Sequence, residues 1–324
     1  MVAANRHIKI AERVSTRLKL KQLRLLVAVA ERSSILHAAQ DLNISQPAAT
    51  KLIKDLELDF GVRLFDRTNR GAIPTAFGEA LVRHGKLILA QVYHAAQELD
   101  DLNEGSGGRV VVGTLLAASA WLLPAAIKTM CEDRPNVTIA VRDGTNDVLM
   151  PALSAGDVDL VVGRLPEFRH RKDLAQIRLL EEETCIVARA GHALARRDRV
   201  DFADLTDHSW ILQPPETSLR RQFEKAFFDR DLVPPVAAVE SVSFLTNREL
   251  LMRTDMLGVF PYHVVAPEVA RGDLAILPCR VDLSGRAVGV TYRRAGGLSP
   301  AAQAFLAVLR DTAAGAAPPT LRED

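Results

Sequence analysis

Apolar residues near the N-terminus recur at spacings of three and four residues, which is the pattern of short amphipathic helices. Two sets follow this pattern: Leu23, Leu26, Val27 and Ala30, and then Ile35, Ala38, Ala39 and Leu42. Ser33 or Ser34 offers an N-cap to the second helix, and Ser45 offers one to a third helix that runs to about Asp59. The pattern therefore predicts three short helices between Leu20 and Gly61.

The third predicted helix has an apolar side and a polar side. The apolar side, which we expect to pack on the second helix, consists of Ala48, Leu52 and Leu56. The polar side, with its two flanking residues, consists of Gln46, Pro47, Thr50, Lys51 and Lys54. Two short helices of this kind form a helix-turn-helix, in which Gln reads an adenine edge and Lys or Thr contacts bases or phosphates. The alternative is the solvated face of a small helical bundle.

A short β-hairpin is predicted directly after the third helix. The chain runs from Arg63 to a turn at Gly71 and returns through Pro74, and the tip of the hairpin carries Arg67 and Arg70. A basic wing beside a recognition helix lies over the phosphate backbone and adds affinity with little sequence information. An ordinary exposed hairpin is the alternative.

Thr75 is placed to cap a long helix that runs to about Asn103. Residues at an a/d heptad spacing within it are Leu81, Gly85, Ile88, Val92, Ala95, Leu99 and Leu102. Several heptads of this kind predict a seam with a second chain, and the alternative is a helix packed on its own body. The glycine-rich segment at 104–108 then predicts a flexible hinge.

Beyond the hinge, short apolar runs alternate with amphipathic segments. Strands are expected at 110–112, 137–141, 157–163, 184–187, 210–212, around 239, 258–261 and 287–292. Helices are expected at 120–130, 148–153, 218–229 and 300–310. This alternation predicts βαβ units with mainly parallel sheets, arranged as two lobes with a ligand cleft at the strand ends.

Charge is distributed unevenly along the 324 residues, although the formal net charge is only +1. The first 90 residues carry 15 Lys and Arg against 8 Asp and Glu, so this part is basic and the remainder is acidic. Such a division indicates that only the N-terminal part contacts nucleic acid.

Several classes of protein are disfavoured by what the sequence lacks. No apolar run reaches the roughly 20 residues of a membrane span, and no secretory h-region is present, so we expect a cytoplasmic protein without membrane contact. The three cysteines, Cys131, Cys185 and Cys279, are far apart, and we expect structural rather than redox roles for them. No metal-ligand spacing, nucleotide-binding motif or nucleophile elbow is found, so we expect no metal, no cofactor and no catalytic residues.

The run from Ala38 to Leu81 resembles the N-terminal winged helix of the LysR-type transcriptional regulators. The segments that match in identity and spacing are Ala38-Ala39, Ser45-Gln46-Pro47-Ala48, Leu56-Glu57, Gly61-Val62-Arg63-Leu64-Phe65, Arg67, Thr75 and Gly78-Glu79. The resemblance implies DNA contacts by Gln46, Pro47, Thr50 and Lys51. Lys51 stands where the family usually has Arg, so a bidentate guanine contact is not carried over to this position.

From Arg109 the chain is similar to the LysR effector domain, a type 2 periplasmic-binding-like fold, in segment order and short local matches. Asp143-Gly144-Thr145 and Gly163-Arg164-Leu165 resemble members that sense aromatic acids, in which the Thr and Arg line the pocket. Arg164 is placed to hold a carboxylate, and the alternative is an Arg that bridges the lobes. Ala117 occupies the usual ligand-hydroxyl position, which leaves a sugar, a sugar acid and an aromatic or other organic acid open. The expected effector contacts are Leu116, Ser119, Thr145, Arg164, Gln213, Ser243 and Pro261.

These observations predict an α/β protein with an N-terminal winged helix-turn-helix, a long linker helix and a two-lobed effector domain. The expected parts are a disordered basic leader (1–17), the winged helix (18–77), a dimerisation helix (78–104), the effector domain (105–312) and a flexible tail (313–324). The predicted function is sequence-specific transcription regulation controlled by a small metabolite. The alternative is a stand-alone small-molecule-binding protein or dehydratase-like enzyme.

The partners that this interpretation implies are double-stranded promoter DNA, the small-molecule effector and further copies of the chain. Pairing through the linker helix would give a homodimer, and a homotetramer is expected from the resemblance. RNA polymerase is a further candidate partner.

Overall fold

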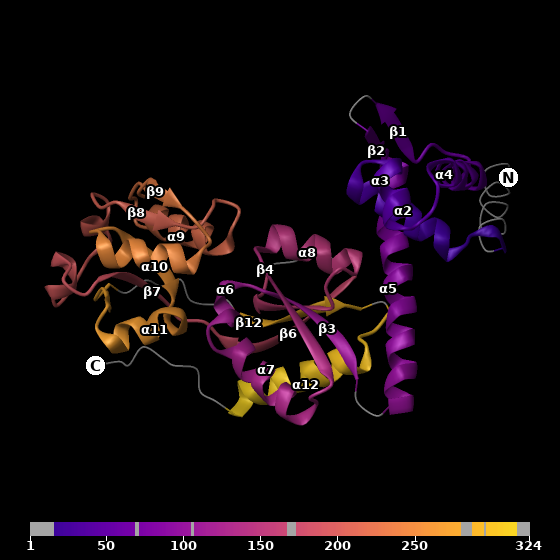
Figure 1. Cartoon of the computed structure of the whole chain (residues 1–324). Coiled ribbons are helices and arrows are strands. Elements are labelled where there is room, and N and C mark those ends of the chain that lie inside the picture. The colour runs from indigo at the N-terminus through magenta and orange to yellow at the C-terminus, as the bar shows by residue number, and fades with distance from the viewer. Residues whose placement is uncertain are drawn as a thin grey trace, which may run out of the picture. The chain divides into compact units, whose positions relative to one another are not determined.

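The protein is described by a computed structural model, which places residues 16–68, 71–104, 107–166, 173–279, 287–294 and 296–315 (Figure 1). The chain forms two compact units. The first comprises residues up to Leu99 together with Ser154–Asp157, and the second comprises Asp100–Leu153 and the chain from Val158. Residues 1–15 of the predicted leader and 316–324 of the predicted tail lie outside the described residues.

The first unit contains helices, a hairpin and most of the long helix. In chain order its elements are α2 (Leu20–Arg32), α3 (Ile35–Asp41), α4 (Gln46–Phe60), β1 (Phe65–Thr68), β2 (Gly71–Pro74) and α5 (Ala76–Glu104). The three short helices begin and end close to the predicted positions. The hydroxyl of Ser34 accepts from the N–H of His37 at 3.3 Å, and that of Ser45 accepts from the N–H of Ala48 at 3.4 Å. These N-caps satisfy backbone donors that a helix leaves unpaired in its first turn.

The apolar side of α4 differs from the prediction by one residue. Ala49, Ile53 and Leu56 are buried, whereas Ala48 is exposed and Leu52 is half-buried. The prediction was therefore wrong for Ala48, whereas Leu52 is partly buried against the core of this unit. The reason is that both α2 and α3 pack on α4, so the buried side is turned toward the groove between two helices rather than toward α3 alone.

A side-chain hydrogen bond from α4 holds the start of the hairpin, and Thr75 caps α5. β1 and β2 pair antiparallel, with Phe65 opposite Pro74. The carboxylate of Glu57 accepts from the N–H of Leu64 at 2.9 Å, and the hydroxyl of Thr75 accepts from the N–H of Gly78 at 3.1 Å. A Cβ on Gly78 would lie 2.0 Å from the carbonyl oxygen of Leu64, so α5 crosses the wing at a distance that only glycine permits.

The N-terminal part of the predicted α5 seam packs within its own chain. Leu81 joins the core of the first unit, and a Cβ on Gly85 would lie 3.6 Å from the side chains of Leu23 and Val27 on α2. Assigning these two positions to a partner chain was wrong, because α2 covers Gly85 and Leu81 packs on the core of its own unit. The later seam residues, which remain exposed in the single chain, are Ile88, Val92, Ala95 and Leu99. The side chain of Leu102 lies outside the described part.

The second unit, in its described residues, has two lobes that each contain a five-stranded sheet. The first sheet, in spatial order, consists of β4 (Val137–Asp143), β3 (Gly108–Thr114), β5 (Leu160–Arg164), β12 (Ala287–Arg293) and β6 (Leu174–Glu181). The helices of this lobe are α6 (Leu116–Ser119), α7 (Leu122–Asp133), α8 (Asn146–Ala155) and α12 (Pro300–Gly315). α12 therefore continues three residues into the predicted tail.

The second sheet, in spatial order, consists of β11 (Leu274–Ile276), β7 (Thr184–Arg189), β10 (Leu257–Pro261), β8 (Trp210–Leu212) and β9 (Ala237–Glu240). Its helices are η1 (Ala193–Arg196), η2 (Phe202–Leu205), α9 (Ser218–Phe228), α10 (Phe244–Arg253) and α11 (Tyr262–Arg271). The core of this lobe is aromatic, with the rings of Phe223 and Trp210 4.7 Å apart and fully buried.

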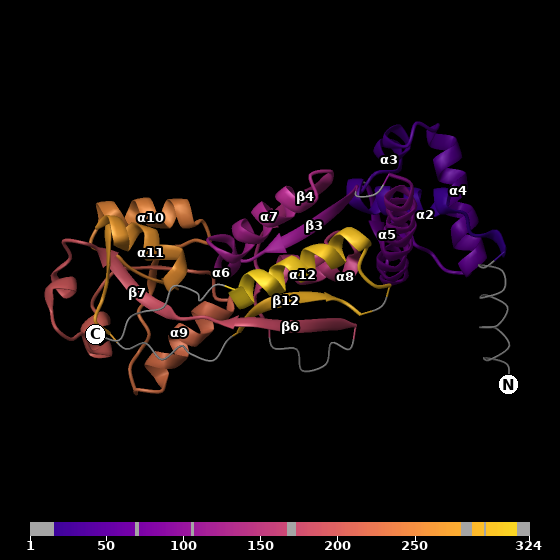
Figure 2. The ribbon, with the colours of Figure 1, turned by 90° about the horizontal axis from the view of Figure 1, so that it is seen from below.

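Both sheets are mixed, which corrects the prediction of mainly parallel sheets. β3 pairs parallel with β4 and β5, but β12 pairs antiparallel with β5 and with β6, beside which it lies in Figure 2. In the second sheet β7 pairs antiparallel with β10 and β11. The chain leaves the first lobe after β6 and enters the second lobe through β7, and it returns to the first lobe through β12. β12 and β7 each run antiparallel to the strands beside them, so both sheets are mixed.

Among the described residues, no helix combines the length and the apolar composition that a membrane span needs.

Candidate functional site

The outer side of α4 carries the residues predicted to contact DNA. Gln46, Pro47, Lys51 and Lys54 are exposed and Thr50 is half-buried, while the opposite side of the helix is in the core. Within the described part of the chain, neither lysine forms an ion pair, so both ammonium groups are available for phosphate oxygens.

The basic wing is described only in part. Arg67 belongs to β1 and pairs with Ala72 of β2, but its side chain lies outside the description, as does the whole of Arg70. Arg32, the last residue of α2, forms an ion pair with Asp41 at 2.7 Å. The hydrogen bond to Asp41 raises the pKa of Arg32, and this guanidinium serves to join the ends of α2 and α3.

A cavity of about 690 Å³ in the second unit contains the residues predicted to contact the effector. All seven lie in its lining: Leu116, Ser119, Thr145, Arg164, Gln213, Ser243 and Pro261. They come from both lobes, because the strand ends and the helix starts of the two lobes meet there. This volume falls within the range of pockets that bind small molecules.

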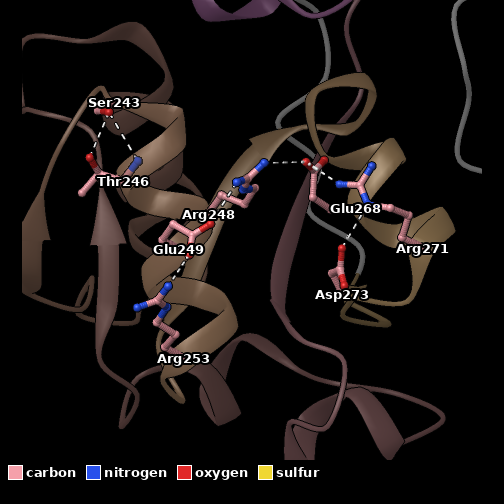
Figure 3. Close-up of polar contacts among 8 residues, drawn as sticks. All are labelled: Ser243, Thr246, Arg248, Glu249, Arg253, Glu268, Arg271 and Asp273. Atoms are coloured by element: carbon pink, nitrogen blue, oxygen red, sulfur yellow. Dashed lines mark hydrogen bonds and ion pairs between the residues drawn. The ribbon is translucent and has the colours of Figure 1, made fainter.

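The N-terminal turns of α8, α9 and α10 line this cavity. Thr217 caps α9 by accepting from the N–H of Arg220 at 3.4 Å. Ser243 caps α10 by accepting from the N–H of Thr246 at 3.4 Å and from its hydroxyl at 3.0 Å, as Figure 3 shows. The first-turn N–H groups of a helix lack intrahelical acceptors, and the helix dipole favours negative partial charge at that end.

The start of α10 is positioned by ion pairs that join α10 to α11 (Figure 3). Arg248 lies 2.9 Å from Glu249 on its own helix and 3.7 Å from Glu268 on α11. The buried carboxylate of Glu268 is also paired with Arg271 at 3.0 Å. These contacts hold α10 against α11, and Ser243, the N-cap of α10, lies in the cavity lining.

Arg164 is buried and has partners on three segments of the chain. Its Nε donates to Glu182, its Nη1 donates to Gln222 at 2.8 Å, and its Nη2 donates to Thr184 at 3.3 Å. Arg164 ends β5 of the first lobe, Glu182 lies in the crossing between the lobes, and Gln222 belongs to α9 of the second. The structure therefore shows the lobe-bridging arrangement, at a residue that also lines the cavity.

Sequence reasoning missed the other residues of the lining. Those that carry polar side chains are Thr114, Asp143, Asn146, Glu182, Glu216, Thr217, Ser218 and Arg221. Thr217 is the N-cap of α9, Asn146 and Ser218 begin their helices, and Thr114 and Asp143 end their strands, so N-cap patterns and strand ends were the signals that could have found these five. Glu182 had no such signal, because it is one of three consecutive glutamates.

The cysteines do not form a reactive centre in the described structure. Cys185 is buried in β7 and donates weakly to the carbonyl oxygen of Phe260 at 3.7 Å. Burial raises the pKa of the Cys185 thiol to about 12, so the thiol stays protonated and unreactive. No cluster of three or more potential metal ligands occurs among the residues that the structure places.

Comparison with known protein families finds two matches that together span most of the chain. Residues 20–79 match the family described as "Bacterial regulatory helix-turn-helix protein, lysR family", and residues 103–314 match the "LysR substrate binding domain".

Two relatives extend this similarity to nearly full length. The HTH-type transcriptional regulator GbpR of Azospirillum brasilense is 36% identical over 298 residues, covering 92% of this chain and 87% of that protein. The HTH-type transcriptional regulator PcaQ of Agrobacterium fabrum is 32% identical over 281 residues, covering 86% and 90%. Both are named as transcriptional regulators, which supports a regulator over a dehydratase-like enzyme.

Solved structures share the fold. Full-length OxyR from Pseudomonas aeruginosa, as a variant, superposes with a TM-score of 0.68 at 23% identity, covering 95% of this chain and 99% of that one. Full-length CbnR complexed with its target DNA superposes with a TM-score of 0.65 at 20% identity, covering 91% of this chain and 100% of that one.

Proposed function

Because the chain belongs to the LysR family of bacterial transcriptional regulators, we propose that α4 reads a specific promoter site and that a metabolite in the cavity controls this reading. The observation that carries the proposal is the outer side of α4, where one glutamine and two lysines without an ion pair to any described residue are exposed, while the opposite side of the helix packs in the core. The proposed domains are those expected above: 18–77 for reading DNA, 78–104 for pairing and 105–312 for sensing.

The proposed DNA contacts divide into base readers and phosphate contacts. Gln46 is suited to two hydrogen bonds with an adenine edge, and Pro47 and Thr50 adjoin it on the helix. Lys51 and Lys54 act as point charges on phosphates or guanine, without the bidentate geometry of arginine. Arg67 and Arg70 of the wing are proposed to contact phosphates.

A second copy of the chain is proposed to pair through α5. Ile88, Val92, Ala95 and Leu99 form a continuous exposed apolar stripe on this helix, beyond the part that α2 covers. A two-fold dimer presents two α4 helices, so the promoter site is expected to be pseudo-palindromic. A homotetramer in the cytoplasm, with RNA polymerase as a contact at the promoter, completes the proposal.

Control by the metabolite is proposed to act through the two lobes. A ligand that contacts residues of both lobes, such as Thr145 and Ser243, stabilises one arrangement of the lobes over others. The ligand thereby shifts a pre-existing equilibrium and changes the presentation of the DNA-reading helices. A sugar, a sugar acid and an aromatic or other organic acid are the candidate classes.

Salt-dependent DNA binding by the full chain tests the proposal. Fluorescence anisotropy with a random-sequence duplex should show affinity that falls linearly with salt on logarithmic axes. Lys54→Ala should weaken binding to every sequence and reduce the salt slope by about 1. Lys128→Ala, which removes an exposed lysine on α7, is the matched control and should leave binding unchanged. Absence of binding at low salt, or identical binding by the two variants, would overturn the proposal.

A further inference from the structure

Two arginines at the cavity or next to its lining are already paired with carboxylates of the protein. The side chain of Arg164 is 6% exposed and is neutralised by the buried carboxylate of Glu182. Arg220, the third residue of α9, is also buried and forms an ion pair with Glu224 at 2.5 Å. Neither guanidinium is therefore suited to anchor an anionic group of a ligand, because a buried partner carboxylate would repel that group.

Arg221, the next residue of α9, is different. It is exposed and lies in the cavity lining, so a ligand can reach it. Its guanidinium donates one hydrogen bond to the described protein, from Nη1 to the backbone carbonyl of Glu216 at 2.5 Å, and forms no ion pair with any described residue. A guanidinium has five N–H groups in a planar fork, so enough of them remain to bind both oxygens of a carboxylate.

The start of α9 adds donors close in sequence to Arg221. Ser218 and Leu219 are the first two residues of this helix, and both lie in the cavity lining. N–H groups at these positions have no intrahelical acceptor, and the helix dipole favours negative charge there. The cap hydroxyl of Thr217 accepts from the N–H of Arg220 rather than from either of these two. α9 therefore presents a full and a partial positive charge to the same cavity.

Exposed carboxylates in the lining limit the charge that the ligand can carry. Asp143 and Glu216 line the cavity, are exposed and form no ion pair with the residues that the structure places. The buried pair of Arg164 and Glu182 is neutral as a unit, which leaves two carboxylates against one guanidinium in the described lining. A second negative charge on the ligand would meet repulsion rather than another free guanidinium, so these residues favour a ligand with a single negative charge.

The start of α10 contributes an apolar part of the lining. Val242 and Leu245 are 49% and 68% exposed, and they line the cavity together with Phe244. Exposed apolar side chains that adjoin one another in a cavity of this size are typical of a surface that an apolar part of a ligand covers. The lining thus combines one accessible cationic group with an apolar surface.

We infer that Arg221 determines the specificity of the cavity by binding the carboxylate of a monocarboxylic acid, whose apolar body contacts Val242, Phe244 and Leu245. The first-turn N–H groups of α9 donate to the same carboxylate. Arg164 bridges the lobes and does not bind the anion. This assignment rests on the proposed function, in which the cavity is the effector site.

Calorimetric titration of the full chain tests the ligand class first. The probes are hexanoate and benzoate as monocarboxylic acids with an apolar body, adipate as a dicarboxylic acid, gluconate as a monocarboxylic acid without an apolar body, and hexanamide as a neutral analogue of hexanoate. Saturable binding of hexanoate or benzoate is expected, with affinities about 10-fold or more lower for the other three. Tighter binding of adipate, gluconate or hexanamide than of both monocarboxylic acids, or no binding of either acid at millimolar concentration, would overturn the inference.

The role of Arg221 is tested with a matched pair of variants. Arg221→Gln should weaken binding of the monocarboxylic acid about 10- to 100-fold, because hydrogen bonds between charged groups are lost, and should leave the affinity for hexanamide unchanged. A general disturbance of the cavity would weaken both ligands alike. Arg310→Gln makes the same chemical change at an exposed position of α12 outside the lining and should bind as the wild type does. Equal affinities of the two variants for the acid would contradict the assignment.

The limit to one negative charge gives a test that does not depend on Arg221→Gln being folded. Asp143→Asn and Glu216→Gln should each raise the affinity for adipate more than the affinity for hexanoate, because each removes a repulsive carboxylate. An unchanged ratio of the two affinities in both variants would overturn the preference for a single charge. DNA binding by the same preparation separates the two proposals, since its absence refutes the regulator, whereas failure of both monocarboxylic acids to bind refutes only the ligand class.

Discussion

Replacing Glu57 with Ala is expected to release the wing from α4. The carboxylate of Glu57 accepts from the N–H of Leu64 at 2.9 Å and from that of Phe65 at 3.4 Å. Both residues are buried, so water does not readily replace the lost acceptor. A hydrogen bond to a charged acceptor contributes about 1.5–3 kcal/mol, and the second bond is long. Because Glu57 is half-buried and partly screened, we expect a total loss of about 2 kcal/mol.

Hydrogen exchange of the full chain measures this loss at the wing. A loss of about 2 kcal/mol corresponds to roughly 30-fold faster exchange of amides around Leu64 and Phe65. Peptides of the second unit should exchange at the wild-type rate, since both hydrogen bonds of Glu57 are made within the first unit.

Asp55→Ala is the matched control, because it removes an acidic side chain from the same helix that has no hydrogen bond to the described residues of the wing. Glu57→Gln should fall between the two, since an amide oxygen still accepts but carries no charge. If Glu57→Ala and Asp55→Ala accelerate exchange equally, the carboxylate does not hold the wing and the reasoning is refuted.

Three further predictions concern packing, pH and thiol chemistry. Gly78→Ala should lower the thermal midpoint of unfolding far more than Gly61→Ala does. A Cβ at Gly78 would lie 2.0 Å from the carbonyl oxygen of Leu64, whereas a Cβ at Gly61 would meet no atom within 4 Å and would be strained only by the φ of 68°. Burial lowers the pKa of His192 below 6.5, so unfolding by urea should become easier as the pH falls through 6.5 and below, and this dependence should weaken in His192→Gln. Iodoacetamide should label the exposed Cys131 in the native chain and Cys185 only after unfolding; early labelling of Cys185 would contradict its burial.

The winged helix could be predicted from sequence because its signals are local. Ser34 and Ser45 precede their helices as N-caps, and the apolar spacing identifies each buried side within a residue. The one-residue error at Ala48 arose because the spacing does not tell whether one helix or two will cover a face. The error at Gly85 has the same origin, because the sequence of an apolar stripe does not tell whether α2 or a second chain covers it.

Some residues of the cavity lining could be predicted, because strand ends and helix N-caps in the sequence indicate them. Thr145, Ser243 and Arg164 stand at such points, and the structure brings them to one cavity. Glu182 could not be predicted, because only the course of the chain between the lobes distinguishes it from the adjacent, exposed Glu181.

The position of β12, antiparallel between β5 and β6, likewise could not be predicted from the local sequence pattern. The strand pairs with residues more than a hundred positions away in sequence, such as Val290 with Val162, and nothing in its own composition specifies that partner. Strand existence is a local property, whereas strand order depends on the whole path of the chain.

Selection of DNA by the full chain tests the central claim, that α4 reads promoter sequence, most directly. Duplexes enriched from a random library should contain two half-sites related by two-fold symmetry. Gln46→Ala should lose base preference within each half-site, and Gln40→Ala, which changes an exposed glutamine on α3, should enrich the wild-type site. Failure to enrich any sequence, or the same site with Gln46→Ala, would contradict the claim.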